Sequence, residues 1–235
     1  MEPIDRLTED PTRAGLFLDI DGVLAPIAAR PADASVPATT RSELRRLAGR
    51  YALVACVTGR PAEEARRLVG VDELTYAGEH GLELEPEAQA WADRIHRFAG
   101  EEAIDGLELK PLSIAFHYRL APDQARARAH LEAVAQRAAA AGFRPRFGRL
   151  VLEVLPPVEA TKGTAVRRLL GRHGLQRALY AGDDTTDLDG FAALDGLEVA
   201  VRVAVASSEG PPELAERADI VVASTGEFLE LLRSL

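Results

Sequence analysis

The stretch Leu16-Phe17-Leu18-Asp19-Ile20-Asp21-Gly22-Val23-Leu24 ends a short apolar run in two carboxylates one residue apart, followed by glycine. Residues i and i+2 of a strand point to the same face, so we expect Asp19 and Asp21 to lie side by side at a strand end. Two neighbouring carboxylates raise each other's pKa unless a cation lies between them or they share a proton. Asp and Gly are also ordinary turn residues. The pair alone therefore leaves an acidic turn and a reactive site equally open.

The composition describes a folded, acidic chain. Of its 235 residues, 47% are hydrophobic, and the formal net charge is −9. This charge argues against nucleic acid or an anionic membrane as a partner, since either needs a basic field. The segment 1–6 lacks the basic and apolar regions of a signal peptide, and no apolar run approaches about 18 residues. We expect a cytoplasmic protein, and a monomeric one. The single cysteine, Cys56, lies in an apolar run, which predicts a core position and excludes an internal disulfide.

Strand and helix patterns alternate in both outer parts of the chain. The predicted strands are 14–20, 51–57, 178–181, 199–203 and 220–222, and the predicted helices are 40–50, 61–69, 162–173, a helix ending near 194, and 227–232. Such alternation predicts a parallel sheet with both faces covered.

The middle of the chain has a different pattern. Segments 107–120 and 144–155 have strand character and flank a strong helical segment, 122–141. This order predicts a smaller α+β domain inserted into the α/β domain. The fold class is therefore α/β, a Rossmann-like parallel-sheet core formed by 1–84 and 159–235, with an α+β cap domain at 85–158.

Polar residues follow three of the predicted strands, and a lysine begins the helix between two of them. They are Asp19 and Asp21, then Thr58 and Arg60, then Lys162, and finally Asp183, Asp184 and Asp187. Ligands of open parallel sheets bind outside the carboxyl ends of the strands. Clustered carboxylates supply the hard oxygen ligands that Mg²⁺ prefers, and the cations and the hydroxyl suit phosphate oxygens. The set predicts a site for a phosphoryl group.

Each of these residues also has an ordinary structural explanation. Thr58 is a possible helix cap and Arg60 a solvated arginine, while the acidic loop is a possible capped helix start. Lys162 is harder to explain in this way, because a cation at a helix N-terminus opposes the helix dipole.

The order and spacing of four motifs resemble the haloacid dehalogenase-like phosphatases. The motifs are Asp19-Ile20-Asp21-Gly22-Val23-Leu24, Thr58-Gly59-Arg60, Lys162-Gly163 and Gly182-Asp183-Asp184. More narrowly, Gly78-Glu79-His80-Gly81, the segment from Lys110 to Arg119 and the segment from Gly182 to Asp187 are similar to the trehalose-6-phosphate phosphatase family. This resemblance implies Mg²⁺-dependent hydrolysis of trehalose 6-phosphate through an aspartyl phosphate, and a cap inserted after the third core strand.

The resemblance also implies roles for individual residues. Asp19 is the expected nucleophile and Asp21 the expected general acid and base. The expected metal site comprises Asp19, the carbonyl of Asp21 and Asp183, with Asp184 and Asp187 in the same acidic loop. Phosphate contacts are expected from Thr58, Gly59, Arg60 and Lys162. Sugar contacts are expected from Gly78, Glu79, His80, Gly81, Lys110, Ser113, His117, Tyr118, Arg119 and Glu153.

Two positions depart from the family pattern. Leu188 follows the last Asp of the acidic loop, where the family usually has Glu, and Leu155 stands where the family usually has Arg or Lys before Pro156. These departures keep open a phosphatase for another sugar or polyol phosphate. A phosphoacceptor switch of the receiver type also combines Asp, Thr and Lys on a parallel sheet. Its accepting Asp lies on an internal strand, however, and receivers lack an inserted domain.

Overall fold

The computed structural model describes residues 3–28, 30, 33–102, 104, 106–148, 150–206 and 210–235. Residues 1 and 2, which belong to the segment analysed for a signal peptide, lie outside the described residues. The chain forms two compact units: a core unit, Met1–Gly81 with Ala160–Leu235, and an inserted unit, Leu82–Glu159. The sequence-based limits lie after residues 84 and 158.

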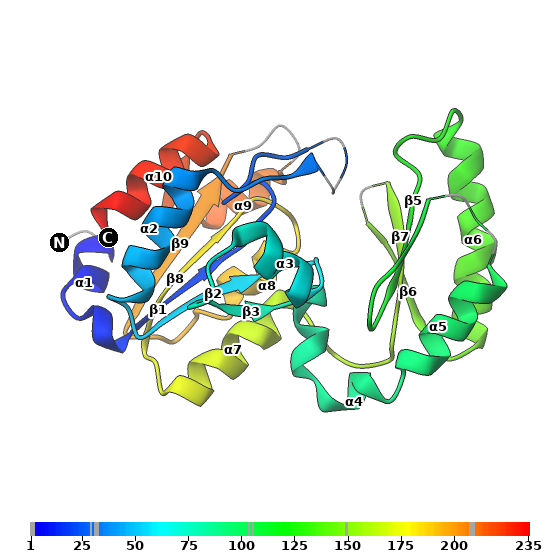
Figure 1. Cartoon of the computed structure of the whole chain (residues 1–235), viewed down its shortest axis with the longest axis horizontal. Coiled ribbons are helices and arrows are strands. Elements are labelled where there is room, and N and C mark those ends of the chain that lie inside the picture. The colour runs from blue at the N-terminus through cyan, green and yellow to red at the C-terminus, as the bar shows by residue number, and fades with distance from the viewer. Residues whose placement is uncertain are drawn as a thin grey trace. The chain divides into compact units, whose positions relative to one another are not determined.

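The core unit is built on a six-stranded sheet in the order β10-β9-β8-β1-β2-β3 (Figure 1). The strands are β1 (Ala14–Leu18), β2 (Leu53–Val57), β3 (Thr75–Ala77), β8 (Arg177–Gly182), β9 (Val199–Val205) and β10 (Ile220–Val222). All neighbouring pairs are parallel. Every residue of β1 and β2 is buried, because helices cover both faces of the sheet. The predicted parallel sheet is confirmed, although β1 ends at Leu18 and not at Ile20.

Helices of the core unit pack on this sheet through their apolar stripes. They are α1 (Pro3–Thr8), α2 (Ala38–Ala48), α3 (Ala62–Val69), α7 (Lys162–His173), α8 (Asp187–Ala192), α9 (Pro212–Arg217) and α10 (Thr225–Ser234), with 3-10 segments at Pro11–Arg13 and Glu79–Leu84. Leu44 and Leu47 of α2 share one hydrophobic cluster with Phe228 and Leu232 of α10. Cys56 lies in the same cluster as a free, fully buried thiol whose pKa is raised by burial, which confirms its predicted core position.

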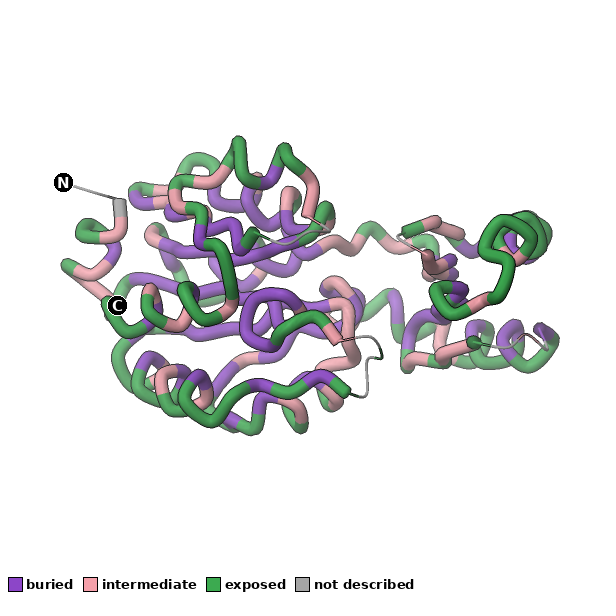
Figure 2. The backbone as a smooth tube through the Cα atoms, turned by 90° about the horizontal axis from the view of Figure 1, so that it is seen from above, coloured by how far each residue is buried: buried purple, intermediate pink, exposed green. Residues whose placement is uncertain are grey.

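The inserted unit is a four-stranded antiparallel sheet in the order β4-β5-β7-β6. Its elements are α4 (Pro86–Gln89), α5 (Ala92–Glu101), β4 (Leu107–Leu109), β5 (Ile114–His117), α6 (Gln124–Ala140), β6 (Arg144–Gly148) and β7 (Val151–Leu155). The predicted strand character of segments 107–120 and 144–155 is confirmed, and each segment contains two strands of this sheet. Figure 2 shows where the buried residues of each unit lie along the backbone. None of the described helices is long and apolar enough to cross a membrane.

Candidate active site

Asp19 directly follows β1 and lies at the carboxyl end of the parallel sheet. Its backbone N–H still donates to the carbonyl of Ala181 in β8, at 3.0 Å. Its Oδ1 accepts a hydrogen bond from the N–H of Ile20 at 2.7 Å, and its Oδ2 lies 2.6 Å from Nζ of Lys162. With only 5% of its surface exposed, Asp19 is a buried carboxylate held in one orientation.

The acidic loop after β8 is organised around the carboxylate of Asp187, which is fully buried. Oδ1 of Asp187 accepts from Nζ of Lys162 at 2.7 Å and from the hydroxyl of Tyr180 at 2.7 Å. Oδ2 accepts from the backbone N–H groups of Asp183 at 3.0 Å and Asp184 at 2.9 Å. Both oxygens of Asp187 are thus engaged in shaping the loop.

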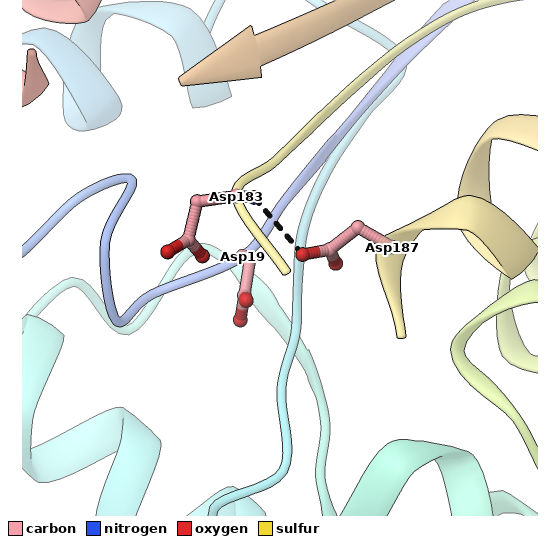
Figure 3. A group of neighbouring side chains, drawn as sticks. All are labelled: Asp19, Asp183 and Asp187. Carbon is pink, nitrogen blue, oxygen red and sulfur yellow. Dashed lines mark hydrogen bonds between the residues drawn. The ribbon is translucent and has the colours of Figure 1, made fainter. Parts of the chain in front are cut away.

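One oxygen from each of Asp19, Asp183 and Asp187 lies within 4.8 Å of the others (Figure 3). Gly22 is required for this approach. Its backbone has φ +82°, and a Cβ atom there would lie 2.1 Å from Oδ2 of Asp183. The glycine after the Asp19–Asp21 pair therefore lets the two acidic loops touch.

Lys162 enters the cluster from the first turn of α7 and is 3% exposed. Thr161 caps this helix in a reciprocal capping box with Thr164, which fixes where α7 begins. Gly163 brings the start of α7 against α8, since a Cβ atom there would lie 2.3 Å from the carbonyl oxygen of Asp189. The sequence Lys162-Gly163 therefore places an ammonium group between two acidic loops.

Electrostatics at this cluster favour the binding of a cation. Desolvation by burial, followed by repulsion from Asp19 and Asp187, raises the pKa of Asp183 to about 8. Burial also raises the pKa of Asp19 against the opposing attraction of Lys162. Three carboxylates and one ammonium group leave an excess of negative charge. Oxygen ligands from Asp19 and Asp183 fit a divalent cation such as Mg²⁺.

Asp21 has a different partner from Asp19. Its two oxygens accept from Arg60, Nε to Oδ2 at 2.7 Å and Nη2 to Oδ1 at 2.8 Å. Arg60 also pairs with Glu64, one turn along α3. Strand β1 ends at Leu18 and the chain turns at Ile20, whose carbonyl accepts from the N–H of Leu24 at 2.9 Å, so both aspartates follow the strand and do not belong to it. Whether they lie side by side, as predicted, stays a prediction.

The loop after β2 meets the loop after β3. The carbonyl of Thr58, which is 1% exposed, accepts from the N–H of His80 at 2.9 Å, and the carbonyl of Arg60 accepts from the N–H of Glu79 at 2.9 Å. Gly59 gives His80 room, since a Cβ atom there would lie 2.7 Å from Nε2. Glu79 and His80 have φ values of +47° and +55°. The structure thus brings the predicted Thr58–Arg60 and Gly78–Gly81 segments together.

The other predicted sugar contacts belong to the inserted unit and do not share one environment. Tyr118 is part of the unit's hydrophobic core, and Ser113 is 5% exposed. His117 lies 2.6 Å from a carboxylate oxygen of Glu108, and Glu153 pairs with Arg146 at 2.6 Å. Lys110 and Arg119 lie in the segments just before and after β5.

Sequence reasoning missed several partners of the predicted residues. Glu64 follows Arg60 by four residues, a spacing that helix geometry brings together, so this partner had a detectable signal. The sequence gives no signal that Tyr180 is a partner of Asp187. A tyrosine inside a buried strand is an ordinary core residue, and its partner becomes clear only when the structure is known. Asp184, a predicted member of the metal site, is exposed, and its Oδ1 accepts from the N–H of Thr185 at 2.6 Å.

Comparison with known proteins identifies the family. The profile of the trehalose-phosphatase family matches residues 17–220. The chain belongs to the trehalose-phosphatase family. This family consists of phosphoric monoester hydrolases, which agrees with the predicted enzyme class.

Relatives of this trehalose-phosphatase family member differ in length. A trehalose-phosphate phosphatase of Mycobacterium marinum is 34% identical over 214 residues, with 81% of this chain and 54% of that protein covered. An uncharacterized glycosyl hydrolase of Mycobacterium tuberculosis is also 34% identical, but only 16% of it is covered. A probable trehalose-phosphate phosphatase of Sinorhizobium fredii is 31% identical, with 88% of this chain and 84% of that protein covered. The chain thus spans about half or less of the mycobacterial proteins.

Solved structures share the fold. A trehalose-6-phosphate phosphatase related protein has a TM-score of 0.76 at 26% identity, covering 94% of this chain and 96% of that one. The C-terminal domain of the Candida albicans trehalose-6-phosphate phosphatase has a TM-score of 0.75 at 21% identity, covering 98% and 95%. The predicted fold class, an α/β core with an inserted α+β domain, is confirmed.

Proposed function

We propose that this protein hydrolyses trehalose 6-phosphate to trehalose and phosphate, with Mg²⁺ as cofactor and an aspartyl phosphate on Asp19 as intermediate. The observation that carries the proposal is the buried carboxylate of Asp19, hydrogen-bonded to Lys162 and gathered with Asp183 at the carboxyl end of the sheet. Family membership supports the same chemistry. The partner is a small sugar phosphate, and we expect a cytoplasmic monomer.

In the first step, an oxygen of Asp19 attacks phosphorus while the bond between phosphorus and the sugar oxygen breaks. Asp21 donates a proton to that leaving oxygen. In the second step, water attacks the phosphorus of the aspartyl phosphate, and Asp21 takes the proton of that water. The bond between phosphorus and Asp19 breaks, so phosphate leaves and the Asp19 carboxylate is restored.

The residues that would hold Mg²⁺ are Asp19 and Asp183, with the backbone carbonyl of Asp21. When bound, the ion offsets the repulsion between the phosphate dianion and the nucleophile. Both oxygens of Asp187 already accept hydrogen bonds, so we assign this residue to positioning Lys162 and the acidic loop. We assign Asp184 to the outer edge of the loop, since it is exposed.

Phosphate oxygens would be held by Lys162, by the hydroxyl of Thr58 and by the backbone N–H of Gly59. Arg60 has a double task in this scheme. Its guanidinium donates hydrogen bonds to both oxygens of Asp21 and orients that side chain. Transfer of Arg60 from Asp21 to the incoming phosphoryl group would release Asp21 to carry the proton.

The sugar contacts remain predictions. They are Gly78, Glu79, His80, Gly81, Lys110, Ser113, His117, Tyr118, Arg119 and Glu153. Among them, Tyr118 suits a structural role better, because its ring packs in the core of the inserted unit. Leu155 and Leu188 favour the second candidate function, a phosphatase of the same family for another sugar or polyol phosphate.

A substrate panel tests the proposal. Phosphate release would be measured from trehalose 6-phosphate, glucose 6-phosphate, sucrose 6-phosphate and a polyol phosphate, with Mg²⁺ or with a chelator. We expect a clear preference for trehalose 6-phosphate and loss of activity with the chelator. No preference for trehalose 6-phosphate would favour the second candidate, and activity retained without divalent metal would refute the cofactor.

Two conservative variants test the assigned roles. Asp19→Asn should abolish phosphate release, since an amide is a poor nucleophile, and activity near that of the parent would refute the nucleophilic role. Asp21→Asn should slow turnover and allow phosphorylated protein to accumulate. A stable phosphoprotein without turnover in the parent protein would instead indicate a phosphoacceptor switch.

A further inference from the structure

The sheet of the inserted unit has one face that its own helices do not cover. Ile114 and Phe116 of β5, with Leu152 and Val154 of β7, pack into one hydrophobic core with residues of α5 and α6. Successive side chains of a strand point to opposite faces. The residues between these apolar positions therefore lie on the other face, which we call the open face.

A row of residues crosses the open face, with charged side chains on β4, β7 and β6 and an alanine on β5. The register places Glu108 opposite Ala115, Ala115 opposite Glu153, and Glu153 opposite Arg146. Glu108 is paired with His117 on one side of Ala115, and Arg146 is paired with Glu153 on the other. The small side chain of Ala115 therefore lies between two charged pairs.

Two hydrogen bonds join Arg146 to Glu153. Nε and Nη2 of Arg146 both donate to Oε2 of Glu153, at 3.0 and 2.6 Å. The side chain of Glu153 is 13% exposed and that of Arg146 is 38% exposed. The arginine at the sheet edge thus holds the more buried carboxylate in a single orientation. Such control matters for a carboxylate that must meet the hydroxyl groups of a sugar.

We propose that Arg146 is a positioning residue that sets sugar specificity by orienting Glu153. This inference rests on the proposed function, in which the substrate is a sugar phosphate and Glu153 contacts its sugar. Leu155 lies two residues beyond Glu153 on β7, so it shares the open face but brings no charge to it. Arg146 on the neighbouring strand β6 supplies a cation beside Glu153.

The test uses Arg146→Leu, with Arg144→Leu as the matched control. Arg144 lies on the same strand and the same face, but its Nη1 donates to the carbonyl of Val158 at 3.1 Å. Both variants would be assayed with the sugar phosphate that the parent hydrolyses best and with p-nitrophenyl phosphate, which has no sugar. We expect Arg146→Leu to raise KM for the sugar phosphate about tenfold, the scale of one charge-assisted hydrogen bond, with kcat little changed. Hydrolysis of p-nitrophenyl phosphate should stay within about twofold of the parent, and Arg144→Leu should be near neutral on both substrates.

A positioning role predicts dependence on Glu153. In a Glu153→Gln background, Arg146→Leu should add less than about twofold to KM, because the two side chains act as one unit. Arg146→Lys should lie between the parent and Arg146→Leu. Equal losses on both substrates, no change on either, or full additivity with Glu153→Gln would overturn the inference. Failure of the proposed function is visible separately, since the parent would then show no preference for any sugar phosphate over p-nitrophenyl phosphate.

Discussion

Asp187 shows how one buried side chain orders a loop through its hydrogen bonds. Its carboxylate accepts hydrogen bonds from Lys162, Tyr180 and the backbone N–H groups of Asp183 and Asp184. A carboxylate is acceptor-only, so it satisfies four donors that an amide of the same shape would not. We infer that this residue is an organiser of the acidic loop, and that its loss would disturb the placement of Asp183 and Lys162.

Asp187→Asn should therefore destabilise the protein even without metal. The amide adds a donor where donors already converge and leaves Lys162 with one anionic partner fewer, at a cost of about 3 kcal/mol in the free energy of unfolding. Urea unfolding in the presence of a chelator measures this cost. Tyr180→Phe removes only one of the four donors and should cost about 1 kcal/mol. If Asp187 served only as a metal ligand, its removal would relieve repulsion, and the metal-free variant would gain stability.

Arg60 and Asp21 carry the second prediction at this scale. Arg60→Ala removes the guanidinium that binds both oxygens of Asp21 and, in our scheme, later binds phosphate. We expect kcat/KM for the sugar phosphate to fall by roughly 10- to 100-fold, the range for a lost charged contact. Steady-state kinetics measure this loss. The control is Arg66→Ala in α3, the helix that follows Arg60, because the pairing of Arg66 with Asp72 is exposed. Equal activity of the two variants would remove Arg60 from the mechanism.

At the scale of elements, the packing of α7 against α8 determines where Lys162 lies. The helix carries two glycines with different surroundings. A Cβ atom at Gly163 would lie 2.3 Å from the backbone oxygen of Asp189, whereas one at Gly171 would meet no atom within 4 Å. Gly163 therefore fixes how closely α7 approaches α8, and with it the position of Lys162.

Gly163→Ala and Gly171→Ala form a matched pair. Gly163→Ala must push α7 away from α8, so we expect a loss of about 2 kcal/mol in the free energy of unfolding together with lower activity. Gly171→Ala should raise stability by about 0.5 to 1 kcal/mol, since alanine favours a helix over glycine, with activity unchanged. Chemical denaturation and phosphate release measure both effects. Similar effects of the two substitutions would show that the contact between Gly163 and Asp189 is unimportant.

The sequence is most informative about elements whose signals are local. For α7, the sequence places its start at Thr161-Lys162-Gly163 and its end before Gly174, and the structure shows a capping box at Thr161 and a left-handed Gly174. The strands of the inserted unit lacked such signals. The turn after β6 includes Leu150 at φ +56°, where glycine or asparagine would have marked a hairpin. Strand β3 spans only Thr75–Ala77, too short for periodicity to reveal.

Side-chain partners were less predictable than elements. The grouping of Asp19, Lys162 and Asp183 follows from the rule that the strands of a parallel sheet end at one edge. The pairing of Arg146 with Glu153 depends on the register between β6 and β7, and sequence periodicity does not specify register. The pairing of Asp21 with Arg60 depends on the turn after β1. The strand predicted from the sequence ran to residue 20, two residues beyond the end of β1, so the prediction did not include this turn.

At the scale of the whole molecule, the excess negative charge of the cluster links stability to pH and to metal. The pKa of Asp183 in the folded protein is raised to about 8 from 3.8, mainly by desolvation. The folded state therefore binds more protons than the unfolded state between about pH 4 and pH 8, so stability falls as pH rises through this window. Asp19 contributes in the same direction, because burial raises its pKa as well.

Metal should reverse this loss of stability. Without divalent metal, we expect the melting temperature to fall between pH 6 and pH 8, and added Mg²⁺ should raise it at pH 8 more than at pH 6, because binding stabilises the folded state and requires ionised carboxylates. Differential scanning fluorimetry with a chelator or with Mg²⁺ measures both effects. Asp183→Asn is the decisive control. Its amide carries no charge, so without metal at pH 8 the free energy of unfolding of the variant should exceed that of the parent by on the order of 1 to 3 kcal/mol. The melting temperature of the variant should respond little to Mg²⁺. A parent protein whose melting temperature is independent of Mg²⁺ at both pH values would contradict the assignment of Asp19 and Asp183 as metal ligands, whatever the activity of the enzyme.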